Sequence, residues 1–378
     1  RNDPSNGWVV IGHGDENNPV PEGHYDSLST DEATIGPQLD HIHTLSDSDL
    51  GQPHDIEVRD GIGLTAGKDG NVCIIDLYPR DSPSVSATDT STFTNAQTVA
   101  WYPATHPDYA ALIGDRDTLY SVIATSRQVG LGFDATTTNS TLMNGSAWFI
   151  GNSEYLLTAQ KDGQLEVFDA SDFDAKTSVN ASSTNGNSPH DVCIVGTRAV
   201  VCNQGDGDNP KLESIKFLLA TSESVATGFT NEGSFNDSQL NGANRLETLN
   251  SRYVIVASNI SNTLATIDIP DVTDGSTWSI ADIKDTGASD GPSGLALVGD
   301  YAISASNDRV TLWDVSDPTN IGQVDQHVFG SAIGGHDPAV DGRYLYVTGQ
   351  SADTIDVFDL GWEFARDIYA QNLIGGSA

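Results

Sequence analysis

Residues 291–324 read GPSGLALVGDYAISASNDRVTLWDVSDPTNIGQV, and this stretch contains the pattern that decides the fold. Asp300–Ser306 and Val310–Asp314 are short segments with β-branched and aromatic residues, as is typical of β-strands. Asn307-Asp308 between them reads as a hairpin turn, because Asn and Asp tolerate the backbone conformations that tight turns need. The stretch therefore predicts two antiparallel strands joined by a tight turn.

Both strands of this hairpin recur along the chain. The second strand recurs in seven copies, of which two are weak, and they end at Asp76, Asp134 (weak), Asp169, Lys216 (weak), Asp268, Asp314 and Asp359. The first strand also recurs, at Gly61–Gly67, Thr118–Ala124, Glu154–Gln160, Arg198–Gln204, Arg252–Ser258, Asp300–Ser306 and Arg343–Gly349. Two parallel series of the same size indicate an internal structural repeat.

A third apolar segment precedes each pair of strands, most clearly at residues 53–56, 188–192, 291–295 and 335–338. Each unit then contains a strand, a turn, a strand, a hairpin, a strand and a variable fourth strand. A four-stranded unit of about 45–50 residues is typical of a propeller blade. The predicted fold class is all-β, a seven-bladed β-propeller of four-stranded blades.

Two stretches resemble known repeat families. Residues 291–324 resemble the LVIVD repeat, and residues 336–360, HDPAVDGRYLYVTGQSADTIDVFDL, resemble the related YVTN type. The resemblance covers roughly Gln52 to Leu360, and blades 2 and 4 depart from it. It implies a seven-bladed propeller, a fold that serves diverse functions, and so leaves the function open.

The predicted organisation has three parts. Residues 1–52 form an N-terminal extension with one or two strands (Trp8–Ile11 and Leu39–Leu45), residues 53–360 form seven blades, and residues 361–378 form a C-terminal strand (Glu363–Tyr369) and tail. A terminal strand commonly closes such a ring, which removes open sheet edges. The sequence leaves open which strand does so, and whether the N-terminal strand instead completes a neighbouring subunit.

The composition is strongly acidic. The chain has 53 Asp plus Glu against 17 Lys plus Arg, a formal net charge of −36, and 37 Gly. The acids are spread along the chain, which favours a solvated surface suited to high salt over a surface that collects cations. Nucleic acid is excluded as a partner, because phosphate binding needs clustered Lys and Arg.

Other features bear on location. No apolar run reaches the 18 residues that a membrane-spanning helix needs. The chain begins at Arg1 without a signal peptide, which fits a processed mature protein or a trimmed chain, and we expect an extracellular, cell-surface or periplasmic location. Cys73, Cys193 and Cys202 lie in apolar strand patterns, so they are expected to be buried free thiols.

Histidines suggest a candidate site. His54, His190 and His336 share one repeat position, at the start of the innermost strand, and His106 lies nearly equivalently in blade 2. Because equivalent positions in a ring face one axis, these imidazoles could converge on a divalent metal, with Zn²⁺ or a similar ion favoured over Ca²⁺. The residues that follow three of them, Asp55, Asp191 and Asp337, are candidates to orient the rings from behind.

A structural interpretation competes with the metal site. Each His could instead hydrogen-bond to the next blade while the Asp caps a turn. His41 and His43 would share one face of a strand, which is a weak metal signal, and a solvated strand is the simpler interpretation. Gly205–Asn209 resembles part of a calcium loop but lacks the distal Glu, so a hairpin insertion is expected there.

The sequence supports three functional hypotheses. The first is a secreted or cell-surface propeller that binds a protein or small ligand, with a divalent metal at the channel mouth as one candidate. The second is a structural protein that self-associates through terminal strands, and the third is a lactonase-like hydrolase. No nucleophile elbow, phosphate loop, zinc-protease motif or haem Cys pair occurs, so enzyme activity stays open and a binding role is favoured.

We predict that the protein becomes more stable as NaCl rises from low to molar concentration, because salt screens the self-repulsion of a chain with net charge −36. Melting temperature at low and high NaCl measures this. A flat or falling trend contradicts the high-salt interpretation, and sulfate cannot replace chloride because it also strengthens hydrophobic burial.

Overall fold

The computed structural model describes residues 2–3, 8–9, 37–80, 82–102, 110–115, 118–125, 128–130, 135–137, 143–150, 154–160, 163–170, 177–183, 188–204, 211–219 and 226–361. The chain divides into two compact units, Arg1–Gly36 and Pro37–Ala378. In the first unit, β1 (Asn2–Asp3) pairs antiparallel with β2 (Trp8–Val9). All other described elements belong to the second unit.

The second unit is built almost entirely from antiparallel strands. In order of pairing, its first two four-stranded sheets are β4 (Pro53–Arg59), β5 (Ile62–Gly67), β6 (Val72–Asp76) and β7 (Ser84–Asp89), then β13 (Met143–Ile150), β14 (Glu154–Gln160), β15 (Gln164–Asp169) and β16 (Thr177–Ser183). The next two are β17 (Pro189–Val195), β18 (Arg198–Asn203), β19 (Lys211–Leu219) and β20 (Ala226–Asn236), then β21 (Ala243–Thr248), β22 (Tyr253–Ser258), β23 (Thr263–Asp268) and β24 (Ser279–Asp285). The last two are β25 (Gly294–Val298), β26 (Tyr301–Ala305), β27 (Arg309–Asp314) and β28 (Gly322–Val328), then β29 (Gly335–Asp341), β30 (Tyr344–Gly349), β31 (Thr354–Asp359) and β3 (Asp40–Ser46). A further sheet contains β8 (Ala96–Trp101), β9 (Ala110–Asp115), β10 (Thr118–Thr125), β11 (Gln128–Gly130) and β12 (Ala135–Thr137).

Apart from Gly361, helical structure in the described ranges is limited to short 3₁₀ turns, η2 (Ser48–Leu50), η3 (Ser238–Leu240) and η4 (Gly275–Thr277). An Asp at the N-cap starts each turn by accepting a backbone N–H from two residues ahead. None of the described helices is long and apolar enough to cross a membrane.

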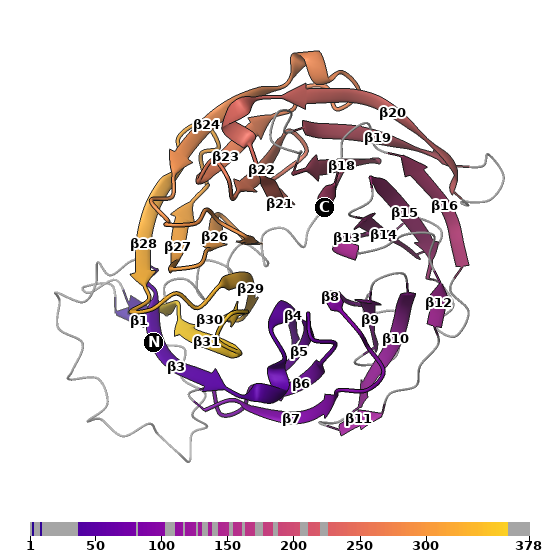
Figure 1. The fold of residues 1–378 in the computed structure, drawn as a ribbon. Coiled ribbons are helices and arrows are strands. Elements are labelled where there is room, and N and C mark those ends of the chain that lie inside the picture. Colours follow the sequence, from indigo (N-terminus) through magenta and orange to yellow (C-terminus); the bar gives the residue numbers. More distant parts are fainter. Residues whose placement is uncertain are drawn as a thin grey trace. The chain divides into compact units, whose positions relative to one another are not determined.

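The sheets of the second unit surround a common axis. The first strand of each sheet contacts the first strand of the next, in the cyclic order β4, β8, β13, β17, β21, β25, β29 and back to β4. Figure 1 shows these first strands around the centre and the last strands, such as β20, β24 and β28, along the rim. This arrangement confirms the prediction of an all-β β-propeller.

The prediction of seven four-stranded blades is wrong: in the described part of the chain, six blades have four strands. The sheet between β4–β7 and β13–β16 departs from the pattern, because β11 and β12 both pair with β10 at opposite ends, in place of one continuous fourth strand. Its second strand is β9, so the segment predicted as the second strand, Thr118–Ala124, is part of the third. The weak repeat copy ending at Asp134 lies outside the described residues.

The N-terminal part of the second unit completes its last sheet. Strand β3 pairs antiparallel with β31, in a register that runs from Asp40↔Asp359 to Ser46↔Thr354. The fourth position of this sheet is thus filled by a segment some 300 residues earlier in the chain. The predicted C-terminal strand, Glu363–Tyr369, lies outside the described residues.

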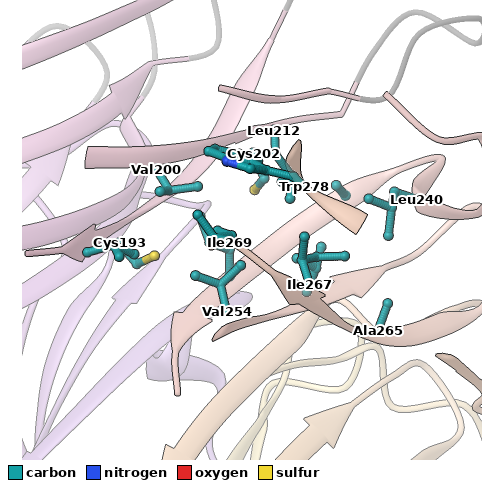
Figure 2. Packing of buried hydrophobic residues seen from close by; sticks show 14 residues of the cluster. Cys193, Val200, Cys202, Leu212, Leu240, Val254, Ala265, Ile267, Ile269 and Trp278 are labelled. Atoms are coloured by element: carbon teal, nitrogen blue, oxygen red, sulfur yellow. The ribbon is translucent and has the colours of Figure 1, made fainter. Parts of the chain in front are cut away.

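Hydrophobic side chains pack between neighbouring sheets. Figure 2 shows one such cluster, in which Cys193 and Val200 of one sheet face Val254 and Ile267 of the next, beside Trp278. Such inter-sheet clusters recur around the ring. All three cysteines are free and buried, and burial raises the pKa of their thiols, so they act as small apolar side chains.

We predict that Leu50→Ala destabilises the protein by about 2–5 kcal/mol, because Leu50 is fully buried in the turn that joins the closing strand β3 to β4. Urea unfolding measures the loss. Val328→Ala is the matched control: Val328 is 55 % exposed, so its truncation should change stability by no more than about 0.5 kcal/mol. Equal effects of the two changes would show that η2 does not anchor the closure.

Candidate functional site

A β-bulge near the start of the innermost strands creates the candidate site. The pairing of β4, β8, β17 and β21 with their second strands slips by one residue at His54, Gln97, His190 and Asn244. A bulge inserts one unpaired residue and re-aims its side chain. These four side chains therefore line a common space, although they come from four different sheets.

The space is a cavity of about 190 Å³ at this end of the channel. His336 from β29 and Ser293, just before β25, complete its ring of inner-strand residues. Lys68, Gln204, Asn259 and Arg245 also contribute to its wall. Every described lining residue is polar, and none of them is an Asp or Glu, in a chain where acids outnumber bases by 53 to 17.

The bulge residues also bond from sheet to sheet. His54 Nδ1 donates to the backbone oxygen of Gln97 at 3.0 Å, and Asn244 Nδ2 donates to the backbone oxygen of Ser293 at 2.9 Å. The imidazole of His336 lies close to that of His54, with 3.7 Å between the two ring centroids. The side chain of one sheet thus satisfies a carbonyl of the next sheet's innermost strand.

The Asp that follows each His makes a second bond in the same direction. Asp55 Oδ2 accepts from Val99 N at 2.7 Å, and Asp191 Oδ2 accepts from Leu246 N at 2.9 Å. Asp337 Oδ2 is 3.4 Å from the backbone N of Ile56 in the same geometry. His-Asp therefore ties neighbouring blades together, as the structural interpretation expected for His, whereas the expectation that the Asp caps a turn is wrong.

The structure brings together three of the four predicted channel histidines: His54, His190 and His336 line one cavity. His106 lies outside the described residues. The innermost strand of its sheet is β8, and Gln97 occupies the bulge position there. The blade 2 alignment was therefore wrong, because this strand lacks the His-Asp pair that marks the others.

His41 and His43 lie elsewhere, on the outer strand β3. The register places His41 opposite Phe358 and His43 opposite Val357, with Ile42 as the extra residue of a bulge. Since adjacent residues of β31 point to opposite faces, the two imidazoles do too, and the expectation of a shared face is wrong. His41 Nε2 instead lies 3.0 Å from Asp356 Oδ1.

The charges around the cavity bear on the predicted metal. Burial lowers the pKa of His54 and His336 well below the usual value. The next largest cause is His336 for His54 and Arg245 for His336, and Arg245 and Lys68 lower the pKa of both. Neutral imidazoles suit metal ligation, whereas neighbouring cations oppose it. In the described ranges no group of three or more His, Cys, Asp or Glu side chains is arranged to hold a metal ion.

Carboxylates line the channel beyond Arg245. Arg245 borders both the histidine cavity and a second cavity of about 280 Å³, and its Nε is 3.8 Å from Asp337 Oδ1. Burial and the nearby Asp55 raise the pKa of Asp337, and burial raises the pKa of Asp191 to about 6. The channel thus changes from a cationic layer at the histidine end to an acidic layer beyond it.

Several lining residues were not anticipated from the sequence. Gln97 and Asn244 occupy the histidine position of their blades, and the correct inner-strand alignment would have found both. Arg245 follows Asn244 at the position that holds Asp in the blades with a His-Asp pair. A basic residue at a position that is acidic in other blades was the sequence signal for Arg245. Lys68 directly follows the second strand of its blade, as Gln204 and Asn259 do in theirs, so this repeat position was its signal.

Comparisons with known proteins support the fold. The chain is similar to the WD40 β-propeller domain of Doa1, seen in a crystal structure, with a TM-score of 0.66 and 12 % sequence identity. The alignment covers 86 % of this chain and 98 % of that one. No family model matches the chain, and no curated protein matches it by sequence. This likeness shows the propeller fold alone, so the function has to be inferred from the site.

We predict that stability falls as pH rises from 7 to about 8.5, because burial raises the pKa of Glu57 and Glu247 in the channel to about 8. Their unfolded forms are already ionised at pH 7, so the folded state holds more protons and loses stability as they leave. Histidine does not contribute in this range, since the pKa of His54 and of His336 is lowered.

Urea midpoints at pH 7, 7.75 and 8.5 measure this slope. Glu247→Gln and Glu57→Gln should each flatten it, whereas Asp69→Asn, at an exposed acid in the β5–β6 turn, should leave it unchanged. A slope that survives in the Glu57→Gln, Glu247→Gln double variant would exclude these two carboxyls as its source.

Proposed function

We propose that this chain is a β-propeller binding protein that acts outside the cytoplasm and holds a small polar ligand in the histidine-end cavity. The observation that carries the proposal is the cavity itself, in which side chains from six blades converge on one space. Bulges direct four of these side chains inward, so the convergence is a repeated feature of the backbone.

The hydrogen-bonding state of the wall supports a ligand role. His336 Nδ1 is buried and has no partner among the described residues, so one polar atom of the wall is unsatisfied. A buried polar group without a partner costs about 1–3 kcal/mol, and a bound polar molecule offsets this cost. Few convergent polar groups in a preformed hollow are what small-molecule sites require.

The divalent metal predicted from the sequence stays part of the proposal as one candidate ligand. The neutral imidazoles of His54 and His336 support it, and His54 hydrogen-bonds to a backbone group through Nδ1, as metal ligands usually do. Lys68 and Arg245 on the same wall weigh against it. Metal salts therefore belong among the molecules tested.

Of the two other hypotheses, the lactonase-like hydrolase stays a proposal, and self-association gains less support. Self-association by exchange of the closing strand would break the pairing of β3 with β31 in the same chain. The LVIVD/YVTN repeat type rests on residues 291–324 and 336–360 alone, and the extracytoplasmic, high-salt setting rests on the acidic composition. The repeat type and this setting stay proposals beside the binding role.

Thermal unfolding tests the proposal with tartrate, succinate, erythritol, glutamate, phosphate, ZnCl₂ and CaCl₂ as trial ligands. A ligand that binds only the folded state raises the melting temperature by mass action. We expect at least one of them to do so, and Ser293→Phe, which fills the cavity from its wall, should abolish that rise.

The matched control is Ser279→Phe, on the exposed side of the outer strand β24, which should keep the rise of the wild type. If every trial ligand shifts wild type and Ser293→Phe equally, the cavity is not a ligand site and the proposal fails.

A further inference from the structure

The histidine-end cavity combines two complementary features. One is positive charge: Lys68 and Arg245 both line it, and no described lining residue is acidic. In a chain with 53 acids and 17 bases, two cations beside a hollow without a carboxylate form a local exception to the surrounding charge. A group that matches this wall carries negative charge.

Both cations place hydrogen-bond donors at the cavity wall. Arg245 uses Nη1 for the backbone oxygen of Asn244 at 3.2 Å and lies 3.8 Å from Asp337 through Nε, whereas a guanidinium has five N–H groups. Lys68 lines the same cavity, and its Nζ donates to Gln350 Oε1 at 3.2 Å. A planar carboxylate is the anion that an Arg fork and a Lys head recognise together.

The second feature is a pair of imidazole acceptors. His54 donates through Nδ1 to a backbone oxygen, so its neutral ring keeps Nε2 as an acceptor. His336 Nδ1 is buried without a partner in the described part of the chain, and it is a second acceptor when the neutral ring carries its proton on Nε2. Acceptors of this kind require a donor, and a carboxylate has none, so a hydroxyl must accompany it.

The volume limits the size of the ligand. A cavity of 190 Å³ is slightly larger than the 150 Å³ that holds benzene in other proteins, which corresponds to about six to ten non-hydrogen atoms. We propose that this cavity binds a small hydroxylated carboxylate, an inference that rests on the proposed binding function. Lys68 and Arg245 hold the carboxylate of this ligand, and His54 and His336 hold its hydroxyl.

Titration calorimetry at fixed NaCl tests this with three molecules. Tartrate has carboxylates and hydroxyls, succinate has only the carboxylates, and erythritol has only the hydroxyls. We expect tartrate to bind about tenfold or more tightly than either of the others, since a hydrogen bond to a charged or buried group changes affinity by about that factor. ZnCl₂ is the fourth molecule titrated.

Two variants separate the two features. Lys68→Met should weaken tartrate and succinate about tenfold or more, whereas Lys284→Met, on the outer strand β24, should change neither. His54→Asn withdraws the Nε2 acceptor but keeps a donor for Gln97, as Asn244 shows at the equivalent position. It should remove the advantage of tartrate over succinate while succinate binds as before.

Equal affinity for tartrate and erythritol would overturn the anion assignment, and equal affinity for tartrate and succinate would overturn the hydroxyl assignment. Zinc binding that His54→Asn abolishes, without tartrate binding, would replace this ligand class by a metal.

If tartrate fails while another trial ligand still loses its effect in Ser293→Phe, only this inference fails. If no molecule distinguishes Ser293→Phe from wild type, the binding function fails with it. Should His54→Asn not fold, the wild-type ranking and Lys68→Met decide the outcome.

Discussion

The free edge of each innermost strand is the constraint on which this propeller depends. Such a strand pairs with its own sheet on one side only, and its other edge faces the channel with peptide groups that need partners. Val99 N, Leu246 N and the carbonyl of Gln97 are such groups, and the preceding blade satisfies each of them with an Asp or His side chain. The recurring His-Asp pair is therefore an answer to a backbone requirement, and its position at a shared cavity follows from the same geometry.

This dual use explains why the metal and structural interpretations of the histidines could not be separated from the sequence. A polar residue at the bulge bonds to the next blade through one atom and borders the cavity with the rest of its side chain. The blade that bears Asn244 at this position makes the bond to the next blade through its side-chain amide. The bond to the next blade requires a side chain that can hydrogen-bond, and it does not require histidine. Only what the cavity holds distinguishes histidine from the other polar residue types.

Much of the fold was predictable because each strand is short and its pattern is local. The segments Tyr253–Ser258, Tyr301–Ala305 and Tyr344–Gly349 are strands within the predicted bounds. The errors arose where local pattern is silent. Nothing in Ala110–Asp115 distinguishes a second strand from a loop, and the bulge at Ile42 depends on the strand against which β3 packs. Lys68 and Arg245 meet at the site only because the ring brings distant turns and strands together.

The closing strand also places a demand on the order of assembly. Residues 40–46 leave the ribosome early, but their partner, Thr354–Asp359, follows some 300 residues later. At synthesis rates of about 5–20 residues per second, β3 waits roughly 15–60 s as an unpaired strand. Its sequence, DHIHTLS, mixes charge and polarity with two apolar side chains, which limits its tendency to pair with other chains during that interval. The last sheet can therefore form only after synthesis has reached residue 359.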